Sequence, residues 1–306
     1  MKKRYLIFTV LLALNGFYNT IIAQQTPVFA NYNYNTIIIN PAHAGYYSDT
    51  DITVASRGYF NQFEGSPRNI GLTFNTPLES KNVGIGAGII NDQIGVTNTT
   101  GVFGAYSYKL FFSSGENDVR WWEHQQHMFS FGIMGGITQY KENLLELGIH
   151  DDPNFENNIN AMVPTLGIGF LYNHRDFYLG LSAPNLLGSS LASDDNINLK
   201  SNYYMHFGYR FFTSSFKEVL ITPSTLVKYI SGAPTQVDIN LTANYKNKVE
   251  IGGGYRTDSS MSFLAGFYIS DHFRLIYNYN QALMSTPINN THGILLNFRF
   301  GDGFKN

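Results

Sequence analysis

The sequence predicts an all-β fold, a closed antiparallel transmembrane β-barrel of about fourteen strands. Aromatic residues are frequent, with 21 Tyr and 24 Phe, and glycine is abundant at 29 of 306 residues. Only 14% of the residues are charged, whereas a soluble domain typically has about 25%. After residue 23 no stretch approaches the roughly 18 apolar residues that a membrane helix needs. Apolar and polar residues alternate instead, as they do in membrane strands.

The start of the chain has the features of a secretory signal peptide. A basic start, Lys2–Arg4, precedes the apolar run Tyr5–Ala13, which is too short to span a bilayer. We therefore expect residues 1–23 to be an export signal, cleaved after Ala23, rather than a membrane anchor. The sequence has no Cys, so we expect neither disulfides nor a lipidated cysteine in the exported protein.

We expect residues 24–306 to form one domain. Residues 24–50 lack the alternation of a strand, and they can enter the lumen as a plug or lie in the periplasm. The sequence does not separate these alternatives. The barrel itself is expected over residues 51–300.

The alternation of apolar and polar residues places the strands. In 237–245 every second residue is apolar, and the residues between are Asp, Asn or Thr. The same period occurs in 273–280 and 294–300, with Ile276 and Leu295 as exceptions. We predict strands at 52–59, 69–77, 82–90, 99–112, 127–140, 163–173, 176–182, 201–213, 218–230, 236–245, 248–255, 260–270, 272–280 and 290–300.

Glycines occupy one face of two of these strands. Gly84, Gly86 and Gly88 alternate with apolar residues, and Gly252–Gly254 are consecutive. Glycine at such positions lets another segment approach the wall, or it bends the barrel. The sequence favours neither explanation.

Connection lengths predict the orientation of the barrel. Membrane barrels have tight turns at the periplasmic end and longer loops outside. The predicted connections 173–176 and 246–247 are tight, whereas 141–162 and 183–200 are the longest in the chain. The connection 113–126 is an exception, because it is long at the end expected to be periplasmic. With an even strand count, both termini are predicted to be periplasmic.

Several function classes are disfavoured. The formal net charge of −2 argues against a nucleic-acid partner, which would require a basic face. His206 and His292 lie on predicted strands, but nothing places them beside a Ser as hydrolytic catalysis would need. We therefore predict that the protein is not an enzyme.

Three clusters of possible metal ligands have simpler explanations. The segment Trp121–His127 contains Glu123, His124 and His127, but its indoles suit an aromatic girdle at the periplasmic rim better. His150–Asp152 and Ser193–Asp195 lack the regular ligand spacing of a calcium loop, so solvated loop charge is the better interpretation. We predict no metal site.

Two segments near the start of the exported chain have a recognisable pattern. Residues 24–32 read Gln-Gln-Thr-Pro-Val-Phe-Ala-Asn-Tyr, and 40–45 read Asn-Pro-Ala-His-Ala-Gly. They resemble the opening of the PorP/SprF family, outer-membrane proteins of the type IX secretion system of Bacteroidetes. The matching positions include Pro27, Phe29, Tyr32, Asn40, Pro41 and Gly45. His43 departs from the family, which usually has Tyr there.

Further matches follow in the same order along the chain. They comprise Arg57 and Pro67 with Gln62, Phe63 and Gly65 between them, then Asn91, Asp92 and Gly95, then Pro184 and Asn185, and finally Leu295–Phe300. The resemblance covers nearly the whole exported chain. At these positions we expect a structural or partner-binding role. For 40–45 the simplest interpretation is a turn that begins at proline and ends at glycine.

The resemblance implies a location in the outer membrane of a Gram-negative bacterium, among lipid and lipopolysaccharide, with no cofactor and no catalytic residue. It implies that the protein helps a secreted adhesin with a type-B C-terminal domain to cross the membrane and stay on it. The resemblance also implies that other type IX secretion components are partners and that the function is linked to gliding motility. An outer-membrane channel for a small solute or hydrophobic ligand is the alternative, and a purely structural barrel is a third. The sequence does not identify the cargo or the stoichiometry.

Overall fold

A computed structural model of the chain describes residues 32–58, 65–112, 127–149, 152, 155–187, 200–212, 218–257, 260–283 and 290–304. The expected signal peptide, its cleavage point after Ala23 and the motif residues Pro27 and Phe29 lie outside these ranges. Within them, no helix is long and apolar enough to cross a membrane.

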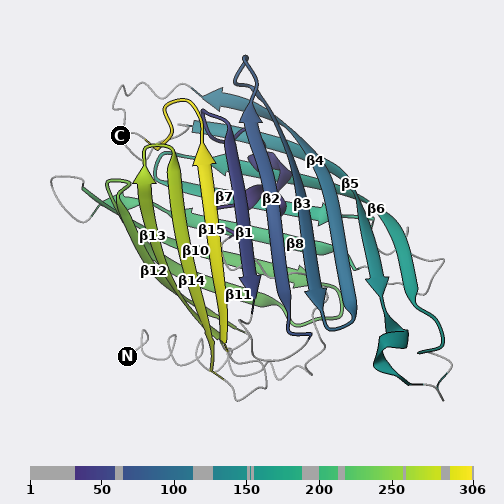
Figure 1. The fold of residues 1–306 in the computed structure, drawn as a ribbon. Helices are drawn as coiled ribbons and strands as arrows, with labels where there is room; N and C mark the ends of the chain where they lie inside the picture. Colours follow the sequence, from purple (N-terminus) through teal and green to yellow (C-terminus); the bar gives the residue numbers. More distant parts are fainter. Residues whose placement is uncertain are drawn as a thin grey trace, which may run out of the picture.

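One antiparallel sheet closes on itself to form a barrel (Figure 1). Each strand pairs with the next around the wall, and β15 pairs with β1, so the strands form a closed ring. Within the closed ring each strand has a neighbour on both sides, as a strand protein in lipid requires. The strands are β1 (Asp51–Gly58), β2 (Arg68–Pro77), β3 (Val83–Ile94), β4 (Thr97–Phe112), β5 (His127–Glu142), β6 (Ile159–Asn173), β7 (Phe177–Asn185), β8 (Asn202–Tyr209), β9 (Phe211–Phe212), β10 (Val219–Ile230), β11 (Gln236–Tyr245), β12 (Val249–Arg256), β13 (Ser260–Ser270), β14 (Phe273–Ala282) and β15 (Asn290–Arg299).

The predicted strand at 201–213 is divided into β8 and β9 by a break at Arg210. Both pieces pair with β10, and Gly208 opposite Ser224 and Phe212 opposite Leu220 belong to the same register. They therefore count as one strand of the wall. The barrel has fourteen strands, as the alternation predicts.

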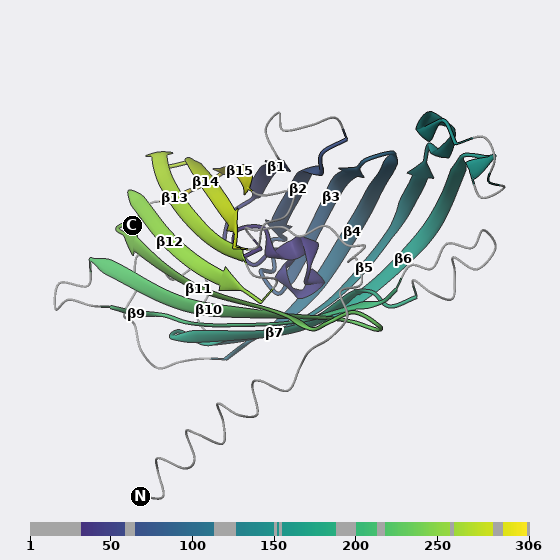
Figure 2. The same ribbon diagram turned by 90° about the horizontal axis from the view of Figure 1, so that it is seen from below.

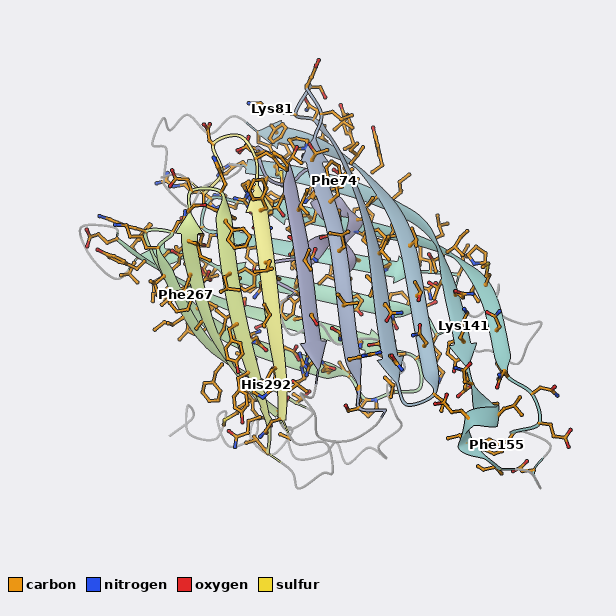
Figure 3. All side chains as sticks on the ribbon, viewed as in Figure 1. Phe74, Lys81, Lys141, Phe155, Phe267 and His292 are labelled. Atoms are coloured by element: carbon orange, nitrogen blue, oxygen red, sulfur yellow. The ribbon has the colours of Figure 1, made fainter. Side chains whose placement is uncertain are left out.

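The wall is apolar outside and polar inside, as the period of two requires. Ile239 and Leu241 are 57% and 54% exposed, whereas Asp238 beside them is 3% exposed. Ile276 and Leu295, the exceptions in the sequence pattern, are completely buried on the inner face. Figure 3 shows side chains along the whole wall, with Phe74 of β2 and Phe267 of β13 among the exposed apolar residues. This exterior suits contact with lipid.

Several strands are longer than predicted. Residues 91–94 were expected to form a loop but belong to β3, which connects to β4 through Gly95 and Val96 alone. β6 starts at Ile159, and β7 continues through Pro184 to Asn185. The prediction was wrong there because apolar alternation stops where polar side chains bond across the ladder, while the backbone pairing continues.

The two ends of the barrel differ. We call the end where β1 begins and β15 stops the near end, and the other the far end. The tight connections 174–176, 246–248 and 271–272 lie at the near end, whereas 143–158 and 186–201 lie at the far end. The predicted alternation of connection lengths therefore holds for these segments, although the far-end turn between β3 and β4 is also tight.

One far-end feature projects beyond the rest of the wall. The hairpin of β5 and β6 extends past the neighbouring strands and carries η3 (Leu144–Leu147), a short 3₁₀ turn (Figure 1).

Candidate functional site: the occupied lumen

Residues 32–50 lie inside the barrel, and we call them the lumen segment. The segment contains two short 3₁₀ turns, η1 (Thr36–Ile38) and η2 (Pro41–His43). Figure 2 shows these turns within the ring of strands, and η2 packs against β4, β5 and β6. Most of its residues are buried, Asn40, Ala42 and Ala44 completely.

The matched segment 40–45 forms the centre of this packing. Asn40 caps η2, because its Oδ1 accepts a hydrogen bond from the Ala42 N–H at 3.0 Å, and Pro41 occupies the first position of the turn. The Asn40 Nδ2 donates to the Phe170 carbonyl of β6 at 3.0 Å. Gly45 has a positive φ of 59°, which only glycine adopts without strain. The turn expected from the sequence is present, and it also contacts the wall.

Serine hydroxyls of the wall bind backbone carbonyls of the lumen segment. Ser182 donates to the Ile39 carbonyl at 2.7 Å, Ser130 to Ala42 at 2.8 Å and Ser107 to Ala44 at 2.6 Å. Lys109 on β4 donates to the carbonyl of Gly45. Irregular backbone leaves carbonyl groups without partners from its own secondary structure, and burying them unpaired is costly. These hydrogen bonds from the wall supply the missing partners, so the segment can be buried.

Glycines of the wall make room for the segment. A Cβ added at Gly84 would lie 2.7 Å from the Gly45 Cα, and one at Gly132 would lie 2.5 Å from the Pro41 carbonyl oxygen. Gly86 and Gly169 likewise face Ile37 and Asn40. Close approach of another segment is therefore the explanation for Gly84 and Gly86, which the sequence left open.

The other glycines that the sequence singled out have a different environment. Gly88 faces the Phe103 ring, and Gly252 and Gly254 face Thr242 and Asn240 of the neighbouring strand. They accommodate side chains of the wall rather than the lumen segment.

The start of the lumen segment contacts the opposite part of the wall. Tyr32 is buried, and its hydroxyl accepts a hydrogen bond from Asn240 Nδ2 at 2.7 Å. The Tyr34 hydroxyl donates to Glu250 Oε1 at 2.5 Å. The segment thus crosses the lumen from β11 and β12 to β4, β5 and β6.

A cavity of about 170 Å³ remains at the near end of the lumen. His43, Tyr46 and Tyr47 of the lumen segment form one side of it. Arg274 and Arg299 of the wall form another part of its lining. Charged side chains therefore form part of the lining of this cavity.

The described part of the wall contains buried ion pairs. Arg299 Nε of β15 is 3.2 Å from Asp51 Oδ2 of β1, across the seam where the first and last strands meet. Asn297 also donates to Asp51, at 2.8 Å. Towards the far end, between β11 and β12, Arg256 makes two bonds of 2.8 Å to Asp238.

The other matched residues lie mostly at the far end. Arg57 of β1 donates to Thr291 Oγ1 at 3.0 Å, and its charge interacts with that of Asp92 on β3. Asn91 donates to Asn98 Oδ1 and to Thr100 Oγ1 on β4, both at 2.9 Å.

Gly95 forms the turn between β3 and β4 with a φ of 57°, and its N–H donates to the Gly65 carbonyl at 2.8 Å. Pro67 precedes β2 at the same end. These residues hold together the hairpin connections of the far end. The structure does not bring them near the matched residues of the lumen segment.

Pro184 and Asn185 belong to neither group. They end β7, where the pairing with β8 becomes irregular after Ser182. Pro184 packs so closely on β6 that a Cβ at Gly167 would lie 2.6 Å from its Cα. Asn185 lies opposite Asn202. Both residues are therefore part of the wall.

Of the possible metal clusters, only His127 and Asp152 are among the described residues. The His127 ring lies 4.1 Å from the His174 ring, between centroids, at the near end. Burial and the His127 charge lower the pKa of His174 from its ordinary value. Within the described ranges no group of His, Cys, Asp and Glu could hold a metal ion.

Sequence reasoning missed the wall residues that hold the lumen segment. Ser107, Ser130 and Ser182 look like ordinary members of the polar face of their strands, and so do Gly132 and Gly169. Small residues at alternate positions of neighbouring strands were the available signal, because they indicate that something occupies the space in front of them.

Comparisons with solved structures give the same fold. The toluene transporter TodX of P. putida has a TM-score of 0.52 and 8% identity, over 87% of this chain and 94% of that one. A TodX deltaS2S3 mutant, described as a monoaromatic hydrocarbon channel, gives 0.50 and 10%, over 86% and 93%. The outer membrane protein Omp33 of Acinetobacter baumannii gives 0.44 and 8%, over 84% and 100%. At such identities the likeness to TodX shows the fold alone.

No curated relative matches the sequence. A family model, the type IX secretion system membrane protein PorP/SprF, matches residues 21–298. The match spans the lumen segment and the barrel up to β15, so it includes the wall as well as the motifs at the start. The chain belongs to the PorP/SprF family of type IX secretion system membrane proteins.

Proposed function

We propose that the protein is an accessory barrel of the type IX secretion system in the outer membrane. It binds an adhesin with a type-B C-terminal domain, helps that adhesin to cross or remain attached to the membrane, and thereby supports gliding motility. Membership of the PorP/SprF family supports a role in secretion. The observation that favours a binding partner over an open pore is the occupied lumen, in which wall side chains hold a buried segment.

In the proposed orientation the near end faces the periplasm, with both ends of the barrel domain there. Three tight turns lie at the near end and two of the longest connections at the far end, with the tight turn between β3 and β4 and the long connection 113–126 as exceptions. In membrane barrels short turns are periplasmic and long loops extracellular. In the same proposal the lumen segment acts as a plug that prevents free diffusion of solutes.

Deletion of the gene followed by proteomics of the cell surface tests the secretion role. We expect the loss of one large surface adhesin while other type IX cargo remains, and restoration of that adhesin by the wild-type gene. An unchanged surface proteome would contradict the proposal.

Affinity purification tests the partnership directly. The intact protein is solubilised in detergent, purified and examined by mass spectrometry, with an unrelated outer-membrane barrel as the control. We expect the adhesin or a type IX component with this protein only. If both baits retain the same proteins, the partnership is wrong.

A channel for a small solute or hydrophobic ligand is the second candidate, and the fold shared with the transporter TodX favours it. The lumen wall is polar, however, with Lys109, Asn297 and Arg299 all buried on it, and such a surface does not suit a hydrophobic solute. Liposome swelling distinguishes the two. Rapid solute entry through the wild-type protein would favour the channel, whereas no entry is expected if the lumen segment is a plug.

A further inference from the structure

Basic side chains surround the near-end cavity. Arg175, Arg210, Arg274 and Arg299 line it, and Glu250 is the only acidic residue in its described lining. Arg210 uses its N–H groups on neutral acceptors, among them the Asn173 side chain at 3.1 Å. No described carboxylate forms an ion pair with Arg210 or Arg274. Arg299 is already paired with Asp51 in the wall, so the excess positive charge of the cavity comes from Arg210 and Arg274, and the Glu250 charge offsets part of it.

Two of these arginines are buried and keep N–H groups without a partner. Arg299 and Arg274 are 1% and 6% exposed. The Arg299 Nη1 and the Arg274 Nε have no hydrogen-bond acceptor among the described atoms. A buried donor without an acceptor is costly, so both positions favour an acceptor that enters the cavity.

Aromatic rings hold the guanidinium groups in place. The Arg299 Cζ lies 3.8 Å from the centroid of the Tyr47 ring and 4.3 Å from that of Phe304. The Arg274 Cζ lies 4.9 Å from the centroids of both Tyr34 and Phe304. Stacking on a ring occupies the face of a guanidinium and leaves its edge for hydrogen bonds. The shared Phe304 ring keeps the two groups close together.

We propose that the near-end cavity binds an oxyanion, a carboxylate or phosphate group, through Arg274 and Arg299 with Arg210 beside them. An arginine edge matches the oxygens of either group. One buried water needs about 10–15 Å³, so a cavity of about 170 Å³ has room for such a group and several waters. This inference does not depend on the proposed role in secretion.

Ligand-dependent stabilisation of the full chain in detergent tests the site. The thermal unfolding midpoint, Tm, is measured against sodium phosphate and, separately, sodium malonate, with sodium chloride holding the ionic strength constant. A ligand that binds only the folded protein raises Tm in a saturable way. We expect this for at least one of the two anions, and the anion that acts identifies the ligand class. If neither raises Tm saturably, the proposal is wrong.

Matched variants locate the binding. Arg274→Lys keeps the charge but removes the planar edge, and we expect the apparent Kd to rise about 10–100-fold. Arg210→Gln, at a half-buried position, is expected to weaken binding. It replaces Arg274→Lys as the test variant if Arg274→Lys does not fold. Arg256→Lys is the control, because this buried arginine pairs with Asp238 outside the cavity. Equal affinity in all three variants would place any binding elsewhere and overturn the proposal.

Discussion

Replacing Gly132 by alanine tests whether the wall glycines hold the lumen segment in place. The added Cβ would lie 2.5 Å from the Pro41 carbonyl oxygen and closer still to the Ala42 nitrogen. Ordinary contact begins near 3.4 Å, so the segment must move by about 1 Å. A shift of that size lengthens the 2.8 Å bond from Ser130 to the Ala42 carbonyl.

The magnitude follows from these two effects. Overpacking costs about 1–3 kcal/mol, and a weakened hydrogen bond adds about 0.5–1.5 kcal/mol. Together they span about 1.5–4.5 kcal/mol. A loss of about 2–3 kcal/mol, within this span, displaces the docked segment roughly 30–150 times more often, because each 1.4 kcal/mol is tenfold. The barrel wall itself is expected to remain folded.

A single introduced cysteine measures the displacement. The chain has no Cys, and Ala44 is completely buried, so Ala44→Cys provides a thiol that reacts with a maleimide only when the segment moves. We expect Gly132→Ala to increase the labelling rate about 30–150-fold in this background.

Gly135→Ala is the matched control, because Gly135 lies on the same strand with no atom within 4 Å of the added Cβ. We expect the labelling rate of this variant to equal that of the parent. Equal rates for Gly132→Ala and Gly135→Ala would refute the packing argument. Gly84→Ala provides a second, independent clash, with the Gly45 Cα at 2.7 Å.

Three further substitutions test other contacts. Asn40→Ala removes the cap of η2 and the bond to Phe170, and we expect the docking of the lumen segment to lose about 1–2 kcal/mol of free energy. Faster thiol labelling of the Ala44→Cys background measures this loss, and an unchanged labelling rate would contradict the role of Asn40. Asp238→Asn leaves Arg256 without its carboxylate and should lower the free energy of unfolding in urea by about 3–5 kcal/mol, whereas a neutral result would mean that water replaces the pair. Ile133→Arg places a charge on the lipid face near the middle of β5, and we expect the free energy of unfolding in lipid vesicles to fall by about 2–4 kcal/mol. A variant that keeps an apolar side chain at this position should show no such decrease.

The barrel could be predicted because lipid imposes a simple rule on its wall. In 237–245 every outward position must be apolar and the inward positions are polar, so the period of two is visible in the sequence. The strand count follows from that rule alone. The break at Arg210 could not be predicted, since the residues on both sides keep the alternation.

The lumen segment could not be derived from local sequence. Asn40 bonds to Phe170, Tyr32 to Asn240 and Tyr34 to Glu250, all partners more than a hundred residues away in the chain. Such contacts exist only once the wall is closed. The same holds for the near-end cavity, whose arginines belong to separate strands and connections.

The seam between β1 and β15 has a consequence for biogenesis. β15 is synthesised after all the other described strands, and β1 directly follows the lumen segment. Asp51 of β1 pairs with Arg299 of β15 across the seam. The ladder that completes the ring therefore cannot form until the chain has been synthesised through β15. The lumen segment forms hydrogen bonds with strands on both sides of the ring. It must therefore be enclosed before the β1–β15 ladder forms, or while it forms. A chaperone or insertase that holds the two terminal strands apart would also control whether the interior is filled.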